Sequence, residues 1–234
     1  MKMGKTVGIV PFASGFDTEK TYEDKYFFTN TYGIRASEAG LSPIGVLPVD
    51  REIKGSVLSF CDCFILIGGR GIGKFHMEVI DHAVKNGKKV LGICLGCQAI
   101  GSYFRTADIA AETGWEGSIA DLYMKLRAEN SHPFLKEVKG HRPGDLLRGR
   151  ADELKHKVTL VAGTNIRNII GSDSLMGASL HIYAIDGCPG GLTVSGYTDD
   201  GVIEAVEHGD TVIGTQFHPD ADDKLPQFFK WLAE

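Results

Sequence analysis

The sequence predicts an α/β fold in which an open, mostly parallel sheet carries helices on both faces. Over the first hundred residues, short apolar runs of strand length alternate with segments whose apolar residues recur at helical spacing. Several of these segments end in glycine or proline, which stop helices and turn the chain. Alternation of this kind needs crossover connections, and crossovers place helices on both faces of a parallel sheet.

The expected elements of this first part can be assigned in chain order. The run TVGIVP is typical of a buried strand that ends at a proline. One helical segment is closed by Gly40, and a second has Gly87 as its stop signal. The expected strands are Thr6–Pro11, Pro43–Leu47, Cys63–Ile67 and Val90–Ile93, and the expected helices run from Tyr26 to Ala39 and from Phe75 to Val84.

The second half of the chain is less regular. Residues 105–157 are charged and lack clean periodicity, which predicts a partly helical insertion over one end of the sheet, with its best helix at Ile119–Arg127. Strand character returns from Val158. A hairpin, a strand and a closing helix are then expected at Leu192–Val206, Val212–Phe217 and Leu225–Glu234. Because no repeat or low-complexity linker interrupts the chain, residues 1–234 are expected to form a single domain.

Composition excludes several classes of partner. The net charge of −5 is spread along the chain without a basic run, which argues against nucleic acid and anionic membranes as partners. No apolar stretch approaches the ~20 residues that span a bilayer, and Met1–Pro11 lacks the apolar core of a signal peptide. The five cysteines, an odd number without a secretion signal, are expected to be reduced, so a cytoplasmic location is predicted.

The strongest chemical signal is a cysteine between a strand and a helix. Residues 89–98 read KVLGICLGCQ, so an apolar strand runs into Gly92-x-Cys94-x-Gly96 and a helix follows at once. Glycines on both sides permit the sharp turn of a nucleophile elbow, and a helix N-terminus favours a thiolate. The backbone N–H of Leu95 would then face a developing oxyanion.

Other interpretations of the same residues are open. Taken alone, the pattern also fits a small buried thiol, since free cysteines are often interior. Cys94 and Cys97 form a Cys-x-x-Cys pair that is typical of redox proteins, and Cys61 with Cys63 could complete a zinc site. However, Cys-x-Cys is an unusual zinc pairing. We therefore expect neither a metal nor a cofactor.

The segment Gly92–Gln98, GICLGCQ, resembles the nucleophile signature of class I glutamine amidotransferases. Within that superfamily the chain is most similar to the γ-glutamyl hydrolase-like peptidases, including γ-glutamyl-γ-aminobutyrate hydrolases. The resemblance covers about 90 N-terminal residues well and the chain from Val158 in outline, but not residues 105–157. It implies a flavodoxin-like sheet, and it implies Cys94 as nucleophile with Gln98 beside the substrate.

The same resemblance extends to the C-terminal strand. The family has Gln-x-His-Pro-Glu, and Gln216, His218 and Pro219 match it in place. This implies that His218 is the general base. Asp220 stands where the family has glutamate and is expected to orient His218. Asp222 and Asp223 lie near enough in sequence to be alternatives.

The resemblance also suggests residues for the oxyanion and the substrate. Gly68-Gly69 ends a strand, and the family uses such a pair for the second oxyanion donor, here Gly69. The alternative is that the two glycines only form a tight turn. Residues 177–181 resemble the family's Asn-Ser-x-His segment, which holds the α-amino and α-carboxylate groups of the glutamyl moiety. Ser179, Leu180 and His181 are therefore expected at the substrate, although Ala178 replaces the asparagine and His181 could equally be structural.

Three functions follow from these residues. The preferred hypothesis is a hydrolase that cleaves a γ-glutamyl amide through a glutamyl thioester. The second is a glutaminase subunit that delivers ammonia to a synthase partner, which the short loop Arg70–Lys74 favours. The third is a degenerate, non-catalytic glutamine-binding module, against which intact Cys94 and His218 argue. The expected partners are a small γ-glutamyl substrate and either a second copy of the chain or a synthase chain.

Overall fold

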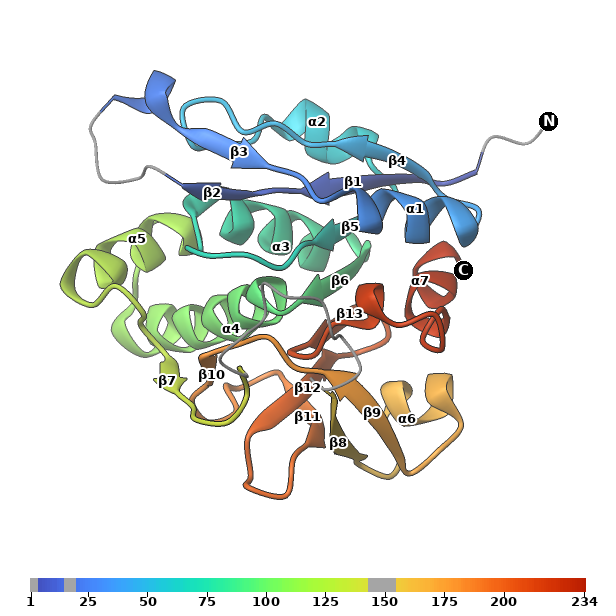
Figure 1. Cartoon of the computed structure of the whole chain (residues 1–234). Coiled ribbons are helices and arrows are strands. Elements are labelled where there is room, and N and C mark those ends of the chain that lie inside the picture. Colours follow the sequence, from blue (N-terminus) through green and yellow to red (C-terminus); the bar gives the residue numbers. More distant parts are fainter. Residues whose placement is uncertain (1–3, 15–19, 143–154) are drawn as a thin grey trace.

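The fold is organised around one large mixed sheet. The computed structural model describes residues 4–14, 20–142 and 155–234. Nine strands pair in the order β4-β1-β5-β6-β13-β12-β11-β8-β9 (Figure 1). Their bounds are β1 Thr6–Val10, β4 Ser42–Gly45, β5 Cys63–Leu66, β6 Lys89–Ile93, β8 Lys155–Leu160, β9 Ser174–Ala178, β11 Thr193–Tyr197, β12 Ile203–His208 and β13 Val212–Thr215.

The two halves of this sheet differ in strand direction. β4, β1, β5, β6 and β13 pair in parallel, and their order is the 2-1-3-4-5 arrangement of flavodoxin-like sheets. β12, β11, β8 and β9 extend the sheet by antiparallel pairs. The predicted α/β class is thus confirmed, with an antiparallel half beside the parallel one. Strand order reverses at β1, so ligands are expected beyond the carboxyl ends of β1, β5 and β6.

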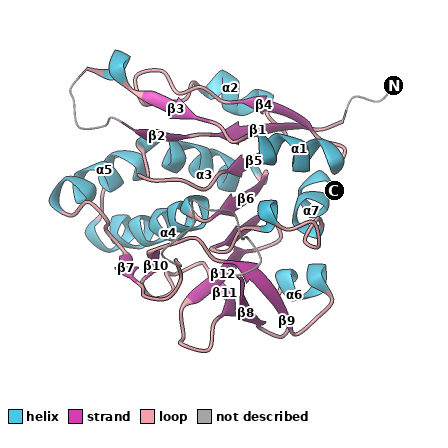
Figure 2. Cartoon of the chain, in the orientation of Figure 1, coloured by secondary structure: helices cyan, strands magenta, loops and turns pink. Residues whose placement is uncertain are grey.

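Helices cover both faces of the sheet. Figure 1 shows α3 (Lys74–Asn86), α4 (Leu95–Thr113) and α5 (Ile119–Glu129) on one side, and α1 (Asn30–Glu38), α6 (Asn165–Ile170) and α7 (Gln227–Ala233) on the other. Coloured by secondary structure, the strands form a layer between these two groups (Figure 2). Along β5 the side chains alternate between two cores: Phe64 and Leu66 face one, and Cys63 and Ile65 face the other. This double burial explains why the strand is a continuous apolar run.

The remaining elements are short. Two small antiparallel pairs lie outside the large sheet: β2 (Phe12–Ser14) with β3 (Lys25–Phe27), and β7 (Leu135–Glu137) with β10 (Tyr183–Ile185). Helix α2 spans Gly55–Phe60, and 3-10 turns lie at Thr21–Glu23 and Pro219–Ala221. Of the helices that the structure describes, none combines the length and the apolar character needed to cross a bilayer.

Two expectations about local structure need correction. The segment expected as a helix from Tyr26 begins with strand β3, and α1 starts only at Asn30. The insertion expected at 105–157 begins later, because α4 continues to Thr113 and ends at Gly114, which has the left-handed φ of 65° that glycine adopts readily. Helix α5 lies where it was expected, whereas residues 143–154 lie outside the described residues.

Candidate active site

Cys94 occupies the sharp turn between β6 and α4. Its backbone has φ 52° and ψ −101°, a strained conformation for a residue with a side chain. The flanking glycines are required by close packing, because a Cβ on Gly96 would lie 2.3 Å from the carbonyl oxygen of Leu66. A Cβ on Gly92 would lie 2.6 Å from the backbone of Gly96. This geometry presents the sulfur of Cys94 at the N-terminus of a helix of 19 residues.

His218 and Asp220 lie beside this turn, just beyond the end of β13. The backbone N–H of His218 donates to the carbonyl of Ala178 over 2.9 Å, which anchors the histidine to β9. Its Nδ1 lies 3.1 Å from Oδ1 of Asp220, and both side chains are buried. The structure thus brings Cys94, His218 and Asp220 together, because His218 hydrogen-bonds both other side chains.

The electrostatics of this group favour a charged imidazole. Burial alone would lower the pKa of His218, but the negative charge of Cys94 and the hydrogen bonds with Asp220 and Cys94 outweigh burial and raise that pKa to about 10. An imidazolium next to a thiolate is the pair that cysteine hydrolases need at neutral pH, since the thiolate is the attacking species.

The two alternative carboxylates are engaged elsewhere. Asp222 accepts hydrogen bonds from the Nζ of Lys155 over 2.7 Å and from the backbone N–H of Lys224 over 3.0 Å. Asp223 forms an ion pair with Arg35. Among the described carboxylates, Asp220 is the one whose oxygen is recorded in contact with His218.

Tyr32 is a buried residue of this site that no sequence motif indicates. Its hydroxyl accepts a hydrogen bond from the N–H of Gly68 over 2.9 Å and also hydrogen-bonds the Asp220 carboxylate. Burial and the negative charge of Asp220 raise the pKa of Tyr32 well above its usual range, so the phenol stays protonated. One turn along α1, Arg35 Nε donates to the backbone carbonyl of Asp220. Helix α1 therefore links the Gly68 loop to the carboxylate.

The two expected oxyanion donors both line the cavity next to Cys94. Leu95 is the first residue of α4, so its N–H has no partner within the helix. Gly69 follows β5 and packs so closely on Phe12 that an added Cβ would lie 2.3 Å from the ring. Within the described chain no acceptor is recorded for either amide.

A cavity of about 360 Å³ opens at Cys94. Its walls come from the Gly69 loop, the start of α4, helix α5 with the segment after it, and the segment before β10. The lining residues are Gly69, Arg70, Gly71, Ile72, Cys94, Leu95, Gln98, Tyr123, Arg127, Ser131, His132, Leu135, Arg142, Leu180, His181, Ile182 and Tyr183. Three arginines and two histidines are among them, so the walls are basic.

The expected substrate-binding residues are placed unevenly around this cavity. Gln98 and Leu180 line it. Ser179 is buried outside it, and its hydroxyl donates to the backbone carbonyl of His141 over 2.7 Å. His181 lies at the wall with its side chain only 1% exposed, because its two ring nitrogens face Tyr183 and Glu204. Ser179 and His181 therefore support the wall of the cavity, because their polar side-chain atoms already contact other residues of the chain.

Besides Tyr32, sequence reasoning missed three basic residues that line the cavity. Arg127 lies near the end of α5, whereas His132 and Arg142 lie on the segments around β7. All three belong to residues 105–157, where the motif resemblance stops. The charged composition of that segment was the one sequence signal for these residues. Hydrophobic periodicity could not show that the segment lies over the cavity.

The cysteines do not form a metal site. All five are free, and Cys61, Cys63 and Cys97 are buried in the cores. Burial raises the pKa of Cys97 well above its usual range and that of Cys63 to about 12, so these thiols stay protonated. Among the described residues, the histidines and carboxylates that lie close enough together to share a metal ion do not include a cysteine in their group.

The sheet order, the strained cysteine elbow and the adjacent histidine define a protein of the class I glutamine amidotransferase type. The chain belongs to the peptidase C26 family, whose model matches residues 73–220. It is 32% identical over 154 residues, 65% of its length, to a candidate glutamine amidotransferase of Schizosaccharomyces pombe. It spans about half, 51%, of that relative.

Other relatives include synthases. The chain is 30% identical over 207 residues, 79% of its length, to CTP synthase of Thermosipho africanus, of which it covers 37%. It is 24% identical over 217 residues to the imidazole glycerol phosphate synthase subunit HisH of Agrobacterium fabrum, covering 87% of this chain and 92% of that one. The glutaminase domain of Trypanosoma brucei CTPS, with bound acivicin, has the same fold, with a TM-score of 0.65, 17% identity and coverage of 98% and 92%.

Proposed function

We propose that this chain is a cysteine hydrolase that cleaves the γ-amide bond of a γ-glutamyl substrate through a glutamyl-thioester intermediate. The observation that carries the proposal is the placement of Cys94 in a strained elbow at a helix N-terminus, with His218 and Asp220 beside it. A backbone with φ 52° at a non-glycine residue is a strain that proteins keep mainly where function requires it.

The proposed reaction has two halves. The Cys94 thiolate attacks the γ-carbonyl carbon, and the amides of Gly69 and Leu95 stabilise the oxyanion. His218, oriented by Asp220, gives its proton to the leaving amine as the C–N bond breaks, which leaves the thioester. A water molecule then attacks the thioester, its proton passes to His218, and glutamate and the thiolate are released.

The basic cavity fits an anionic substrate. Gln98 and Leu180 line the same cavity as Cys94, which supports a role for them in binding the glutamyl part of the substrate. Arg70 and Arg142 also line the cavity, and no ion pair with a described carboxylate is recorded for either. We propose that these guanidinium groups attract the carboxylates of the substrate, whereas the cavity-lining residues of α5 and of the segment directly after it, such as His132, contact the leaving amine. Ser179 and His181 would then affect substrate binding indirectly, by supporting the wall of the cavity.

A panel of γ-glutamyl amides tests this function. Glutamine, γ-glutamyl-γ-aminobutyrate and γ-glutamyl peptides are incubated with the isolated chain, and free glutamate is measured. We expect at least one amide to be hydrolysed by the wild type and none by Cys94→Ala. Equal glutamate release by both proteins, or no release from any member of the panel, would overturn the proposal.

A glutaminase that supplies ammonia to a synthase is the second candidate. It is supported by the synthase relatives and by the short loop Arg70–Lys74 beside the cavity. In this case glutamine should be the substrate, and its hydrolysis should rise sharply when the synthase chain is added. Rapid hydrolysis of γ-glutamyl peptides by the isolated chain favours the first candidate instead.

A further inference from the structure

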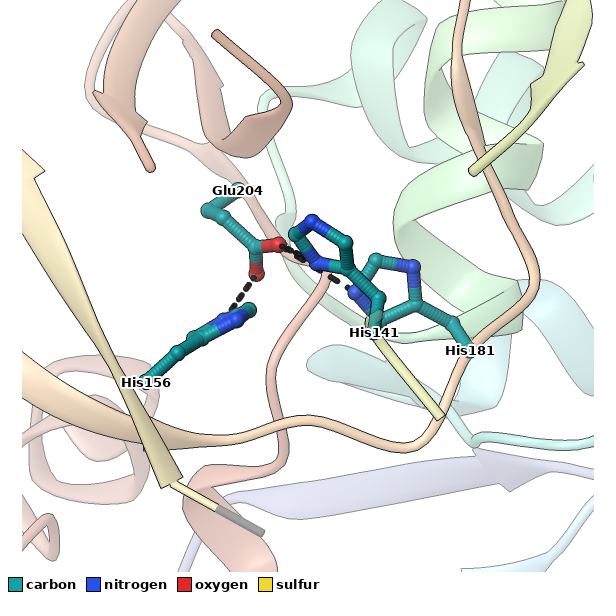
Figure 3. Close-up of side chains that lie close together, drawn as sticks. All are labelled: His141, His156, His181 and Glu204. Carbon is teal, nitrogen blue, oxygen red and sulfur yellow. Dashed lines mark hydrogen bonds and ion pairs between the residues drawn. The ribbon is translucent and has the colours of Figure 1, made fainter. Parts of the chain in front are cut away.

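A second cluster of reactive side chains lies behind the wall of the cavity, outside the cysteine site. His141 follows β7, His156 lies on β8, His181 lies between β9 and β10, and Glu204 lies on β12. Figure 3 shows the three imidazoles arranged around the Glu204 carboxylate. One ligand atom from each residue lies within 4.8 Å of all the others. The Glu204 side chain is fully buried, and His156 is the most exposed of the four, at 22%.

The distances from the three rings to the Glu204 carboxylate are close to those between neighbouring ligands of one metal ion. Bonds of ~2.0–2.2 Å in a tetrahedral zinc site hold neighbouring ligand atoms roughly 3.3 Å apart. Nδ1 of His141, Nε2 of His156 and Nε2 of His181 lie 3.1, 3.3 and 3.2 Å from Glu204 oxygens. The carboxylate is therefore already at ligand distance from all three rings.

Hydrogen bonding alone accounts poorly for this arrangement. Among the described residues, no partner with hydrogen-bond geometry exists for three buried polar atoms that lie at ion-pair distance from one another or from a neighbour: Nδ1 of His141, Nε2 of His156 and Oε2 of Glu204. The contact of His181 with Glu204 meets the geometry of a hydrogen bond, whereas His141 and His156 face the same carboxylate at ion-pair distance. Buried polar atoms left without partners are costly, and a shared cation would satisfy them all.

The outer contacts of two of the three rings, His141 and His181, point to the same conclusion. Nε2 of His141 lies 3.0 Å from a carboxylate oxygen of Asp200, and Nδ1 of His181 lies 3.1 Å from the carbonyl of Tyr183. In the neutral ring whose outward nitrogen carries the hydrogen, that N–H donates a hydrogen bond to its partner and the inward nitrogen keeps a lone pair for a metal ion. Metal-binding histidines in proteins are oriented in this way.

We propose that His141, His156, His181 and Glu204 form a binding site for one divalent transition-metal ion, with zinc as the ion that this set fits best. Three imidazoles and one carboxylate supply four protein ligands, and four protein ligands without an open position distinguish structural from catalytic zinc sites. Carboxylate and imidazole ligands without thiolates also suit other first-row ions, so cobalt is a useful probe.

The metal would connect the sheet to the cavity. It would tie the segment after β7 to β8 and β12, which are far apart in the sequence. The carbonyl of Tyr183 accepts from both His181 and the side-chain amide of Gln98, a residue that lines the cavity. A metal at His181 would thus fix the position of Gln98 and its neighbours without taking part in the reaction.

Metal titration of the full-length protein tests the site independently of activity. Chelator-treated protein, carrying Cys94→Ala to remove the reactive thiol, is titrated with Zn²⁺ alone and with Co²⁺ alone. We expect one equivalent to bind, with the visible absorption of four-coordinate Co²⁺ and no thiolate-to-cobalt charge-transfer band. Zn²⁺ should raise the thermal unfolding temperature of the same protein.

Variants separate this site from adventitious binding. Glu204→Gln and the partly exposed His156→Gln should each weaken binding by roughly 100-fold or more, and Asp200→Asn by about 10- to 100-fold. His82→Gln, on α3 outside the cluster, is the matched control and should bind as the wild type does. Failure to bind one equivalent, a thiolate band, or undiminished binding in His156→Gln would each overturn the proposal.

Discussion

Replacing Tyr32 with phenylalanine should test whether the Tyr32 hydroxyl orients the Asp220 carboxylate, without removing any proposed catalytic group. The hydroxyl accepts from Gly68 N–H over 2.9 Å and hydrogen-bonds Asp220, and Tyr32 is only 3% exposed. Its removal leaves a buried N–H unpaired, which should cost about 1–3 kcal/mol of unfolding free energy. Loss of a triad carboxylate can cost ~10⁴-fold in rate, so loss of a group that only orients it should lower kcat by roughly 10- to 100-fold.

The assay measures urea unfolding and glutamate release in parallel. KM should change little, because Tyr32 contacts the triad and the loop and does not line the cavity. Tyr103→Phe is the matched control: its hydroxyl donates to Asp81 over 3.0 Å, between α4 and α3. Both variants should lose stability, but only Tyr32→Phe should lose kcat. An unchanged kcat in Tyr32→Phe, or equal losses in both variants, would refute this role for the hydroxyl.

Three further predictions concern the proposed triad. Cys94→Ala should lower glutamate release by roughly 10³-fold or more, whereas Cys97→Ala, in the core, should stay active; equal losses would favour a redox pair. Asp220→Asn should lower kcat by ~10- to 10³-fold with KM nearly unchanged. Asp222→Asn should stay near the wild-type rate, since the Asp222 carboxylate binds Lys155 and not His218. If Asp222→Asn is inactive and Asp220→Asn is active, Asp222 and not Asp220 is the carboxylate of the triad. The raised pKa of His218, about 10, means that its proton is retained at neutral pH and lost as pH rises through that value. The pH profile of kcat/KM should therefore fall on the alkaline side near pH 10, and a fall centred near the ordinary histidine value of ~6.5 would contradict the ion pair.

Much of the parallel half of the fold could be predicted from the sequence. Strands buried on both faces, such as Cys63–Leu66, are continuous apolar runs, and glycine marks where α3 ends. The error at Tyr26 arose because β3 is only three residues long and pairs outside the main sheet. A short edge strand has too few residues for a period of two to be distinguished from helical spacing.

The sharp turn at Cys94 could be predicted from the sequence because its backbone geometry determines the neighbouring residue types. The elbow at Cys94 requires glycines on both sides, and that requirement is visible in the sequence. Tyr32 could not be predicted, since its role depends on helix α1 packing against a loop far along the chain. His141, His156 and Glu204 are likewise brought together only by the antiparallel half of the sheet and the segments beside it.

Covalent labelling by a glutamine analogue tests the central claim most directly. A chloroketone analogue of glutamine is added to the wild-type protein, and the modified residue is identified by mass spectrometry. We expect one label per chain, on Cys94, with protection by a γ-glutamyl substrate and no label on Cys94→Ala. Labelling of Cys61 or Cys188, or labelling of Cys94 that glutamate-type ligands do not slow, would contradict a γ-glutamyl site at Cys94.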